Sequence, residues 1–216
     1  MIAMVMLAGL ASADEKTTRT SSIAWSAQEV KRVEIQVPPS EISIRSAPID
    51  RIQLSAEWRV ETRGDEAEWM STVLDGLTFE AVRKDSRLII RDKREGEARS
   101  SKARRRDTEA KIVVTVPDWT SVEVRQTAGE VSLKGNLENV LVSMRAGEIR
   151  MEGPASHVRR LEARARIGEV KTEVGARKES REGVFAGTAL WENPDPEARA
   201  TVELLLTVGE ITVDLY

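Results

Sequence analysis

The 216-residue chain has no cysteine, one histidine and few aromatic residues, which make up 4% of the sequence. Without cysteine the protein forms no disulfide bond, has no catalytic thiol and cannot carry a lipid on an N-terminal cysteine. One histidine, His157, excludes a metal site built from several histidines and leaves one candidate base for a Ser-His-Asp triad. His157 lies between two predicted strands, so we expect it to be a solvated loop residue.

A large excess of charge and a long hydrophobic run are also missing. The net charge is −3, which does not favour nucleic acid or a membrane surface as a general partner. The apolar run at residues 1–10 is too short to cross a membrane. We therefore expect no nucleic-acid partner and no transmembrane span in the mature chain. The length and the ordinary content of charged (32%) and apolar (40%) residues predict one globular domain.

The N-terminus carries an apolar run followed by the small residues Ala11, Ser12 and Ala13. This order resembles a secretory signal peptide over residues 1–13, although no Lys or Arg precedes the apolar run. A short apolar strand or helix is the alternative. Cleavage would export the protein, so we expect it in the periplasm, outside the cell or in the cell envelope.

One short phrase, glycine-glutamate followed by valine or isoleucine, occurs four times between residues 122 and 215. Apolar residues recur at every second position before each glycine and, in a new phase, after it. Such alternation predicts a strand with one buried face on each side of the glycine. Glycine can adopt a positive φ, so we expect a corner there. The copies are Gly129-Glu130-Val131, Gly147-Glu148-Ile149, Gly168-Glu169-Val170 and Gly209-Glu210-Ile211.

Repeats of roughly 20 residues that cannot bury their apolar face alone are expected to stack on one another. The gap between the third and fourth glycines is about twice the others, so we expect one rung without a glycine-glutamate corner at residues 183–191, with Gly187 as a possible corner of another type. The outward positions carry acidic and basic columns side by side, which predicts a charge-laced, solvated face. The expected fold is all-β: a β-solenoid-like stack of strand repeats or a closely related stack of hairpins.

The remaining segments predict N-terminal strands and one inserted helix. Residues 65–76 have the helical period, with acidic residues in the first turn and a glycine at the end. Residues 14–29 form a polar N-terminal segment, of which 14–22 are expected to be disordered, and residues 30–216 a single domain with a charged mobile loop at about 93–109. The predicted strands are 33–37, 41–45, 52–60, 77–82, 87–91 and 110–116.

This arrangement resembles the toastrack family, the bacterial extracytoplasmic domains often called putative adhesins. The features that carry the resemblance are the N-terminal signal-like segment, a strand that ends in Val116-Pro117 and the four corners, with Val208-Gly209-Glu210-Ile211 as the typical last rung. The resemblance covers about residues 30–216. It implies a non-enzymatic β-repeat domain at the cell envelope and supplies no catalytic residue. The chain departs from the family in lacking an evident membrane anchor.

The corner glutamates are the first candidate site. Stacked in register, Glu130, Glu148, Glu169 and Glu210 would form a column of carboxylates, and oxygen ligands of this kind can hold Ca²⁺. Calcium-binding repeats use several acidic residues per turn, whereas each corner here has one. The alternative, which we favour, is local neutralisation by Arg145 and Arg166, three residues before two of the glutamates. We predict no metal and no cofactor.

Two further features have a binding and a structural explanation. The basic run at residues 102–106 could bind anionic lipid, polysaccharide or an acidic partner, but flanking acids favour a solvated loop. The tryptophans could include a sugar-stacking platform, but we favour caps and rim residues of the stack. Trp191 is the strongest candidate among them for facing a ligand, although we favour the structural explanation for it too. The tryptophans considered are Trp25, Trp58, Trp119 and Trp191.

The favoured function is therefore an exported interaction or scaffolding protein that binds another envelope protein or a surface polysaccharide. The alternative is a carbohydrate-active enzyme, or a polysaccharide-binding protein, on a β-helix; no pair of carboxyl groups stands out for hydrolysis. Polymerisation inside the cell through the ends of the stack is a third possibility and would require the N-terminal segment to be retained.

Overall fold

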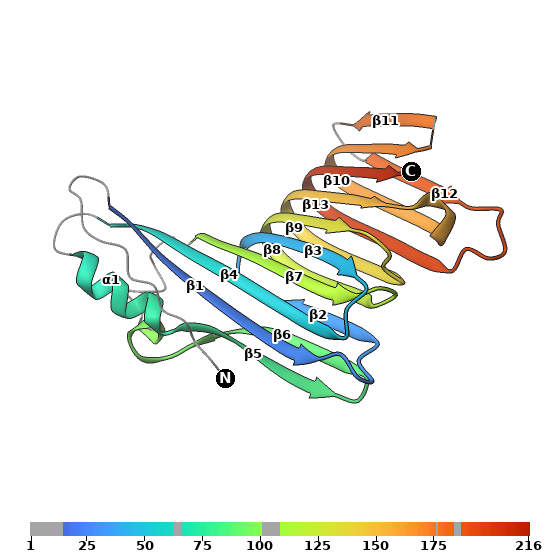
Figure 1. The fold of residues 1–216 in the computed structure, drawn as a ribbon. Helices are drawn as coiled ribbons and strands as arrows, with labels where there is room; N and C mark the ends of the chain where they lie inside the picture. The colour runs from blue at the N-terminus through green and yellow to red at the C-terminus, as the bar shows by residue number, and fades with distance from the viewer. Residues whose placement is uncertain (1–14, 63–65, 101–108, 176, 184–186) are drawn as a thin grey trace.

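The computed structural model describes residues 15–62, 66–100, 109–175, 177–183 and 187–216. Among these residues the chain is all-β with one α-helix, as predicted (Figure 1). Thirteen strands pair into one hydrogen-bonded sheet that does not close on itself. Within the described residues, no helix is long and apolar enough to span a membrane.

Each glycine-glutamate repeat forms one long strand that bends at its glycine. In Figure 1 these strands curve back, so that their two halves lie in two layers with the apolar residues between them. The four strands are parallel and in register, so that the glycines pair with one another in a row. They are β8 (Ser121–Lys134), β9 (Asn139–Gly153), β10 (Val158–Val174) and β13 (Ala200–Leu215).

The order of these strands in the sheet is β8-β9-β13-β10, so the last repeat in the chain lies between the second and the third. The chain between β10 and β13 forms β11 (Arg177–Gly183) and β12 (Gly187–Glu192), which both return antiparallel along β10. Gly187 begins β12, and residues 184–186 of the predicted fifth rung lie outside the described residues. A solenoid of successive turns is not established by an open sheet with this order and stays a prediction.

A further rung, which the sequence did not reveal, is formed by β2 (Arg32–Gln36) and β3 (Ser40–Ala47). β2 pairs with the first half of β8 and β3 with its second half, so that Ser40 lies opposite Gly129. The segment Ser40-Glu41-Ile42 therefore takes the place of Gly-Glu-Ile. Next to this rung, β6 (Arg87–Arg94) pairs with β2, and β7 (Glu109–Pro117) pairs with β3.

The N-terminal end of the sheet is formed by β4 (Arg51–Thr62), β1 (Glu15–Ser26) and β5 (Leu77–Lys84). The prediction of disorder over residues 14–22 is wrong for residues 15–22, because β1 pairs antiparallel with β4 along its whole length. Residue 14 lies outside the described residues. The sequence of β1 is mostly polar and does not indicate which face is buried. In the structure, Ile23 and Trp25 of β1 pack against the core. The predicted hairpin between β5 and β6 is confirmed.

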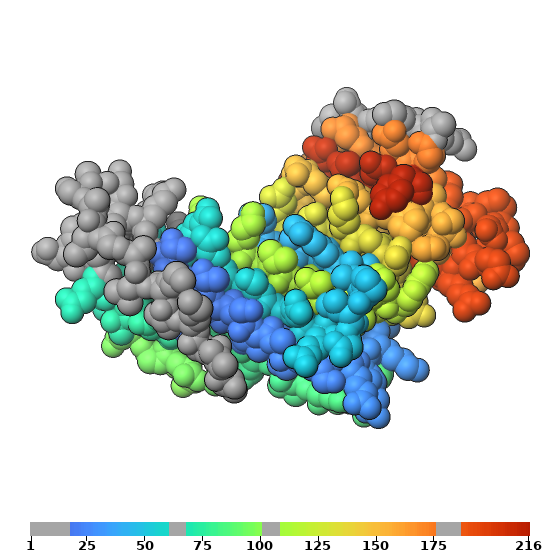
Figure 2. Space-filling view, in the orientation of Figure 1, coloured from blue at the N-terminus to red at the C-terminus, as the bar shows by residue number. Residues whose placement is uncertain are grey.

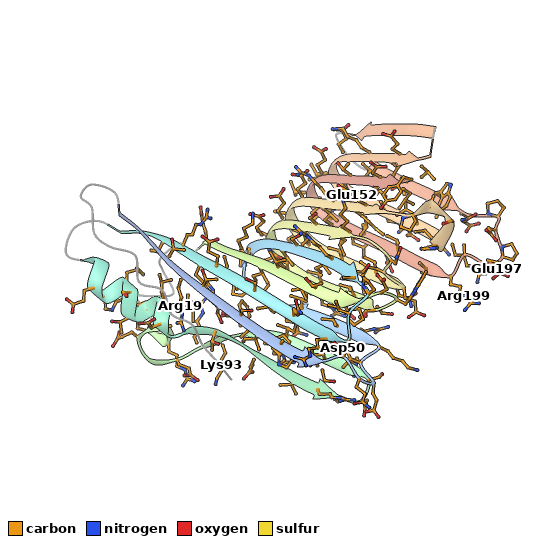
Figure 3. All side chains as sticks on the ribbon, in the orientation of Figure 1. Arg19, Asp50, Lys93, Glu152, Glu197 and Arg199 are labelled. Carbon is orange, nitrogen blue, oxygen red and sulfur yellow. The ribbon has the colours of Figure 1, made fainter. Side chains whose placement is uncertain are left out.

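The helix α1 (Glu66–Asp75) lies at this end, and Arg19 of β1 is 3.8 Å from Asp75 (Figure 3). The prediction of a mobile loop over residues 93–109 is wrong for its first part. β6 extends to Arg94, and the 3-10 helix η1 (Gly96–Arg99) follows, with Ala98 fully buried. The basic run at residues 102–106 lies outside the described residues. Figure 2 shows the elongated molecule, with the C-terminal repeats at the end opposite α1.

Candidate functional site

The glycine corners form a row in which the backbones of neighbouring strands approach very closely. The four glycines have φ between 125° and 137°, a region open to glycine and hardly to other residues. A Cβ atom on Gly147 would lie 1.8 Å from the carbonyl oxygen of Gly129. At the same distance, a Cβ on Gly209 would meet the carbonyl oxygen of Gly147, and one on Gly168 would meet that of Gly209. The row of corners is therefore formed by backbone without side chains.

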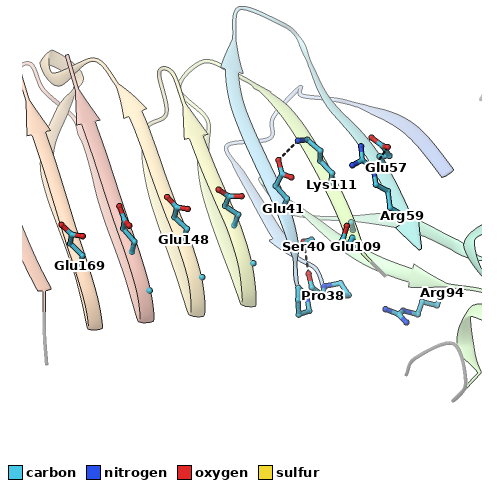
Figure 4. A pocket seen from close by; sticks show the side chains of 17 residues that line it. Pro38, Ser40, Glu41, Glu57, Arg59, Arg94, Glu109, Lys111, Glu148 and Glu169 are labelled. Atoms are coloured by element: carbon cyan, nitrogen blue, oxygen red, sulfur yellow. Dashed lines mark hydrogen bonds and ion pairs between the residues drawn. The ribbon is translucent and has the colours of Figure 1, made fainter. Parts of the chain in front are cut away.

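Five glutamates lie in register across five neighbouring strands, four of them directly after the corner glycines. Strands in a sheet are about 4.8 Å apart, so the carboxylates follow one another at close spacing. Figure 4 shows the row of side chains pointing the same way. Four are the predicted corner glutamates; the fifth was missed, because a serine replaces its glycine. In spatial order this glutamate ladder is Glu41, Glu130, Glu148, Glu210 and Glu169.

Among the described residues, three cations neutralise part of the ladder. Arg150 is 2.6 Å from Glu148 and 3.6 Å from Glu130. Lys171 is 2.9 Å from Glu169 and 3.0 Å from Glu210. Hydrogen bonds to these carboxylates raise the pKa of Lys171, and the bond to Glu148 raises that of Arg150. The third cation, Lys111, is 2.6 Å from Glu41.

Within the described residues, no ion pair joins Arg145 or Arg166 to the ladder, so the prediction that these two neutralise it is wrong there. They lie three residues before their glutamates and beyond the corner, whereas residues two apart in a strand share a face. Arg150 and Lys171 each follow a ladder glutamate by two residues and are therefore its neighbours. Among the described residues, the five ladder carboxylates form ion pairs with three cations.

The ladder forms one wall of a groove of about 1320 Å³. The groove continues over Pro38 and Pro39 to side chains of β4, β6 and β7. Its described lining holds seven carboxylates and three cations, and no aromatic side chain. Among the described residues, no group of three or more His, Cys, Asp or Glu side chains is placed to hold a metal ion. The chemistry of the groove is therefore that of an acidic surface with a rigid backbone floor.

At the N-terminal end of the groove, Glu57 accepts a hydrogen bond of 2.8 Å from Arg59. This bond is the main cause that lowers the pKa of Glu57. A lowered pKa adds stability above the pKa of the unfolded chain, and this contribution is lost as the pH falls through the folded value.

We therefore expect acidification from neutral pH to about pH 3 to lower the melting temperature of the wild type more than that of Glu57→Gln. Thermal unfolding followed by circular dichroism at both pH values measures the difference. The control variant is Glu68→Gln, at an exposed position of α1. An equal acid sensitivity of Glu57→Gln and the wild type would contradict the expectation.

The other predicted site residues lie away from the groove. Trp58 is buried, and Trp25 and Trp191 are partly buried against the core. That such residues cap the ends of the stack stays a prediction. Trp191 does not line the groove. Trp119 is the exposed tryptophan, at 51%, and its ring lies 4.7 Å from that of His157. His157 is in a connection, η2 (Ala155–His157), as predicted, but it is partly buried rather than freely solvated.

Comparisons with known proteins give matches of structure alone. No protein-family model and no curated protein matches the chain. A crystal structure titled as a putative cell adhesion protein from Clostridium sporogenes is 13% identical, with a TM-score of 0.48, over 93% of this chain and 100% of that one. One titled as a putative adhesin from Bacteroides fragilis is 10% identical, with a TM-score of 0.29, over 91% and 97%. Both titles agree with the family resemblance, but likeness at this level does not extend to function.

Proposed function

We propose that the protein is an exported, non-enzymatic interaction or scaffolding protein of the cell envelope, adhesin-like in role, and that the groove binds its partner. The observation that supports this most is the glutamate ladder, five carboxylates held in register by paired backbones. A rigid array loses little conformational freedom on binding, which favours affinity. The seven carboxylates and three cations of the groove's described lining favour a basic surface of another envelope component.

The same geometry favours binding over hydrolysis. The ladder carboxylates are equivalent members of a row, and three cations pair with them. Glycoside hydrolysis needs two carboxyl groups in different environments, one of them kept protonated.

We also propose that the repeats act as a solenoid-like scaffold whose regular spacing sets the spacing of the charges.

Export is the part of the proposal that rests on residues 1–13. Fractionation of the native host, with mass analysis of the N-terminus, tests it. A chain that begins at Asp14 in the periplasmic or envelope fraction would support the proposal, and a cytoplasmic chain that retains Met1 would contradict it.

The triple variant Glu130→Gln, Glu148→Gln and Glu210→Gln tests the groove. We expect it to bind a cell-envelope preparation of the native host at least about tenfold more weakly than the wild type, because charge complementarity is lost. Binding of the wild type should also weaken as salt is raised, since exposed charges are screened. Co-sedimentation over a range of protein and salt concentrations measures both effects.

The matched control removes the same number of charges elsewhere, as Glu68→Gln, Glu80→Gln and Glu197→Gln, all exposed and outside the groove. It should bind as the wild type does. Equal losses in both triple variants would point to general charge rather than the groove. Unchanged binding by the groove variant would show that the partner binds elsewhere.

A further inference from the structure

The edge opposite the glycine corners, where the loops between the strands lie, presents one tryptophan in an unfavourable backbone conformation. Trp119, in the turn between β7 and β8, has a φ of 65° and a side chain that is 51% exposed. A bulky residue in the left-handed region costs free energy and persists only where the surrounding structure holds it there. Because the indole is half exposed, its burial contributes little free energy to offset this strain.

Hydrogen bonds hold the turn in place. The backbone N–H of Trp119 donates to the carbonyl oxygen of Asn136 at 2.7 Å. The Ser46 hydroxyl donates to Asp118 Oδ1 at 2.7 Å and accepts from the N–H of Asn136 at 2.6 Å. Three segments distant in the sequence are thereby joined around Trp119. The indole is presented on a rigid turn rather than on a free loop.

The histidine beside it has an unusual pattern of partners. The rings of Trp119 and His157 lie 4.7 Å apart at an angle of 55°. Nδ1 of His157 is buried and has no hydrogen-bond partner among the described residues. An unpaired buried N–H is rarer than an unpaired buried acceptor, so we assign the N–H of the imidazole to Nε2. Among the described residues, this N–H donor has no acceptor.

We propose that Trp119 and His157 form a binding site for a neutral saccharide, separate from the acidic groove. A sugar ring has an apolar C–H face that can pack on an indole and hydroxyl groups that can accept from Nε2–H. Sites for such ligands combine an aromatic surface with a few placed polar groups. The carboxylate next to Trp119 in the chain, that of Asp118, already accepts a hydrogen bond from the Ser46 hydroxyl. A single indole with its histidine is small for a protein interface, which needs a much larger patch.

The main test is Trp119→Gly, which removes the indole and also relieves the backbone strain. With neutral hexasaccharides as probes (cellohexaose, maltohexaose and chitohexaose), we expect the wild type to bind at least one at millimolar concentration in isothermal calorimetry. The variant should bind that probe at least tenfold more weakly, with an unchanged or higher melting temperature. Tryptophan fluorescence should shift on binding in the wild type and not in the variant.

Two further variants separate binding from folding. His157→Ala should also weaken binding, whereas His157→Gln, which keeps an N–H donor, should retain part of it. Leu190→Ala, at another exposed apolar position, should bind as the wild type does. The proposal is overturned if the wild type binds none of the neutral probes, or if Trp119→Gly binds as well as the wild type. It is equally overturned if binding falls only in variants whose melting temperature falls in parallel.

Discussion

Gly147→Ala is expected to destabilise the protein by about 3 kcal/mol or more, because two costs act at one position. The added Cβ would lie 1.8 Å from the carbonyl oxygen of Gly129, and the backbone φ of 125° is one that alanine rarely adopts. The Gly129 carbonyl belongs to the backbone of a paired strand, so it cannot move without breaking hydrogen bonds between β8 and β9. Chemical denaturation followed by circular dichroism measures the free energy of unfolding.

The matched control is Gly175→Ala. Gly175 also has a positive φ, 56°, but a Cβ there would meet no atom within 4 Å. We expect this variant to lose only about 1 kcal/mol, the cost of the left-handed conformation alone. If the two variants were equally stable, the close approach at Gly147 would not be a constraint on the fold.

Trp58→Ala is expected to lose about 3–5 kcal/mol, the usual cost of deleting a large buried aromatic side chain. Trp58 is 3% exposed and stacks on Phe79, with ring centroids 5.2 Å apart. It lies on β4 between Glu57 and Arg59, which project into the groove from the opposite face of the strand. Its loss would therefore disturb the N-terminal end of the groove as well as the core.

The control for this prediction is Trp58→Phe, which keeps an aromatic ring against Phe79 and leaves a smaller cavity. Its loss of stability should be clearly smaller, as measured by the same denaturation experiment. A loss in Trp58→Ala below about 1 kcal/mol would mean that the site collapses around the gap. Trp25→Ala, in the partly buried edge strand β1, gives a second comparison of a less buried tryptophan.

Much of the glutamate ladder could be predicted from the sequence. The glycine-glutamate phrase marked four of its members, because a repeated phase break places the following residue on the same face of each strand. Glu41 was missed, although the segment Ser40-Glu41-Ile42 carried a partial signal. The cations were misassigned, since their choice depended on how the chain turns at the corner. The Trp119–His157 pair joins segments 38 residues apart, and no local pattern indicates that contact.

The sequence by itself determined the all-β class, the helix at α1 and the glycine corners, because these follow from local period and backbone freedom. Only the tertiary structure decided the order β8-β9-β13-β10 and the pairing of β1 with β4. A strand's alternation shows which face is buried but not which edge it joins, since backbone hydrogen bonds are the same for every sequence. The groove depends on that order, because it brings Glu210 between Glu148 and Glu169.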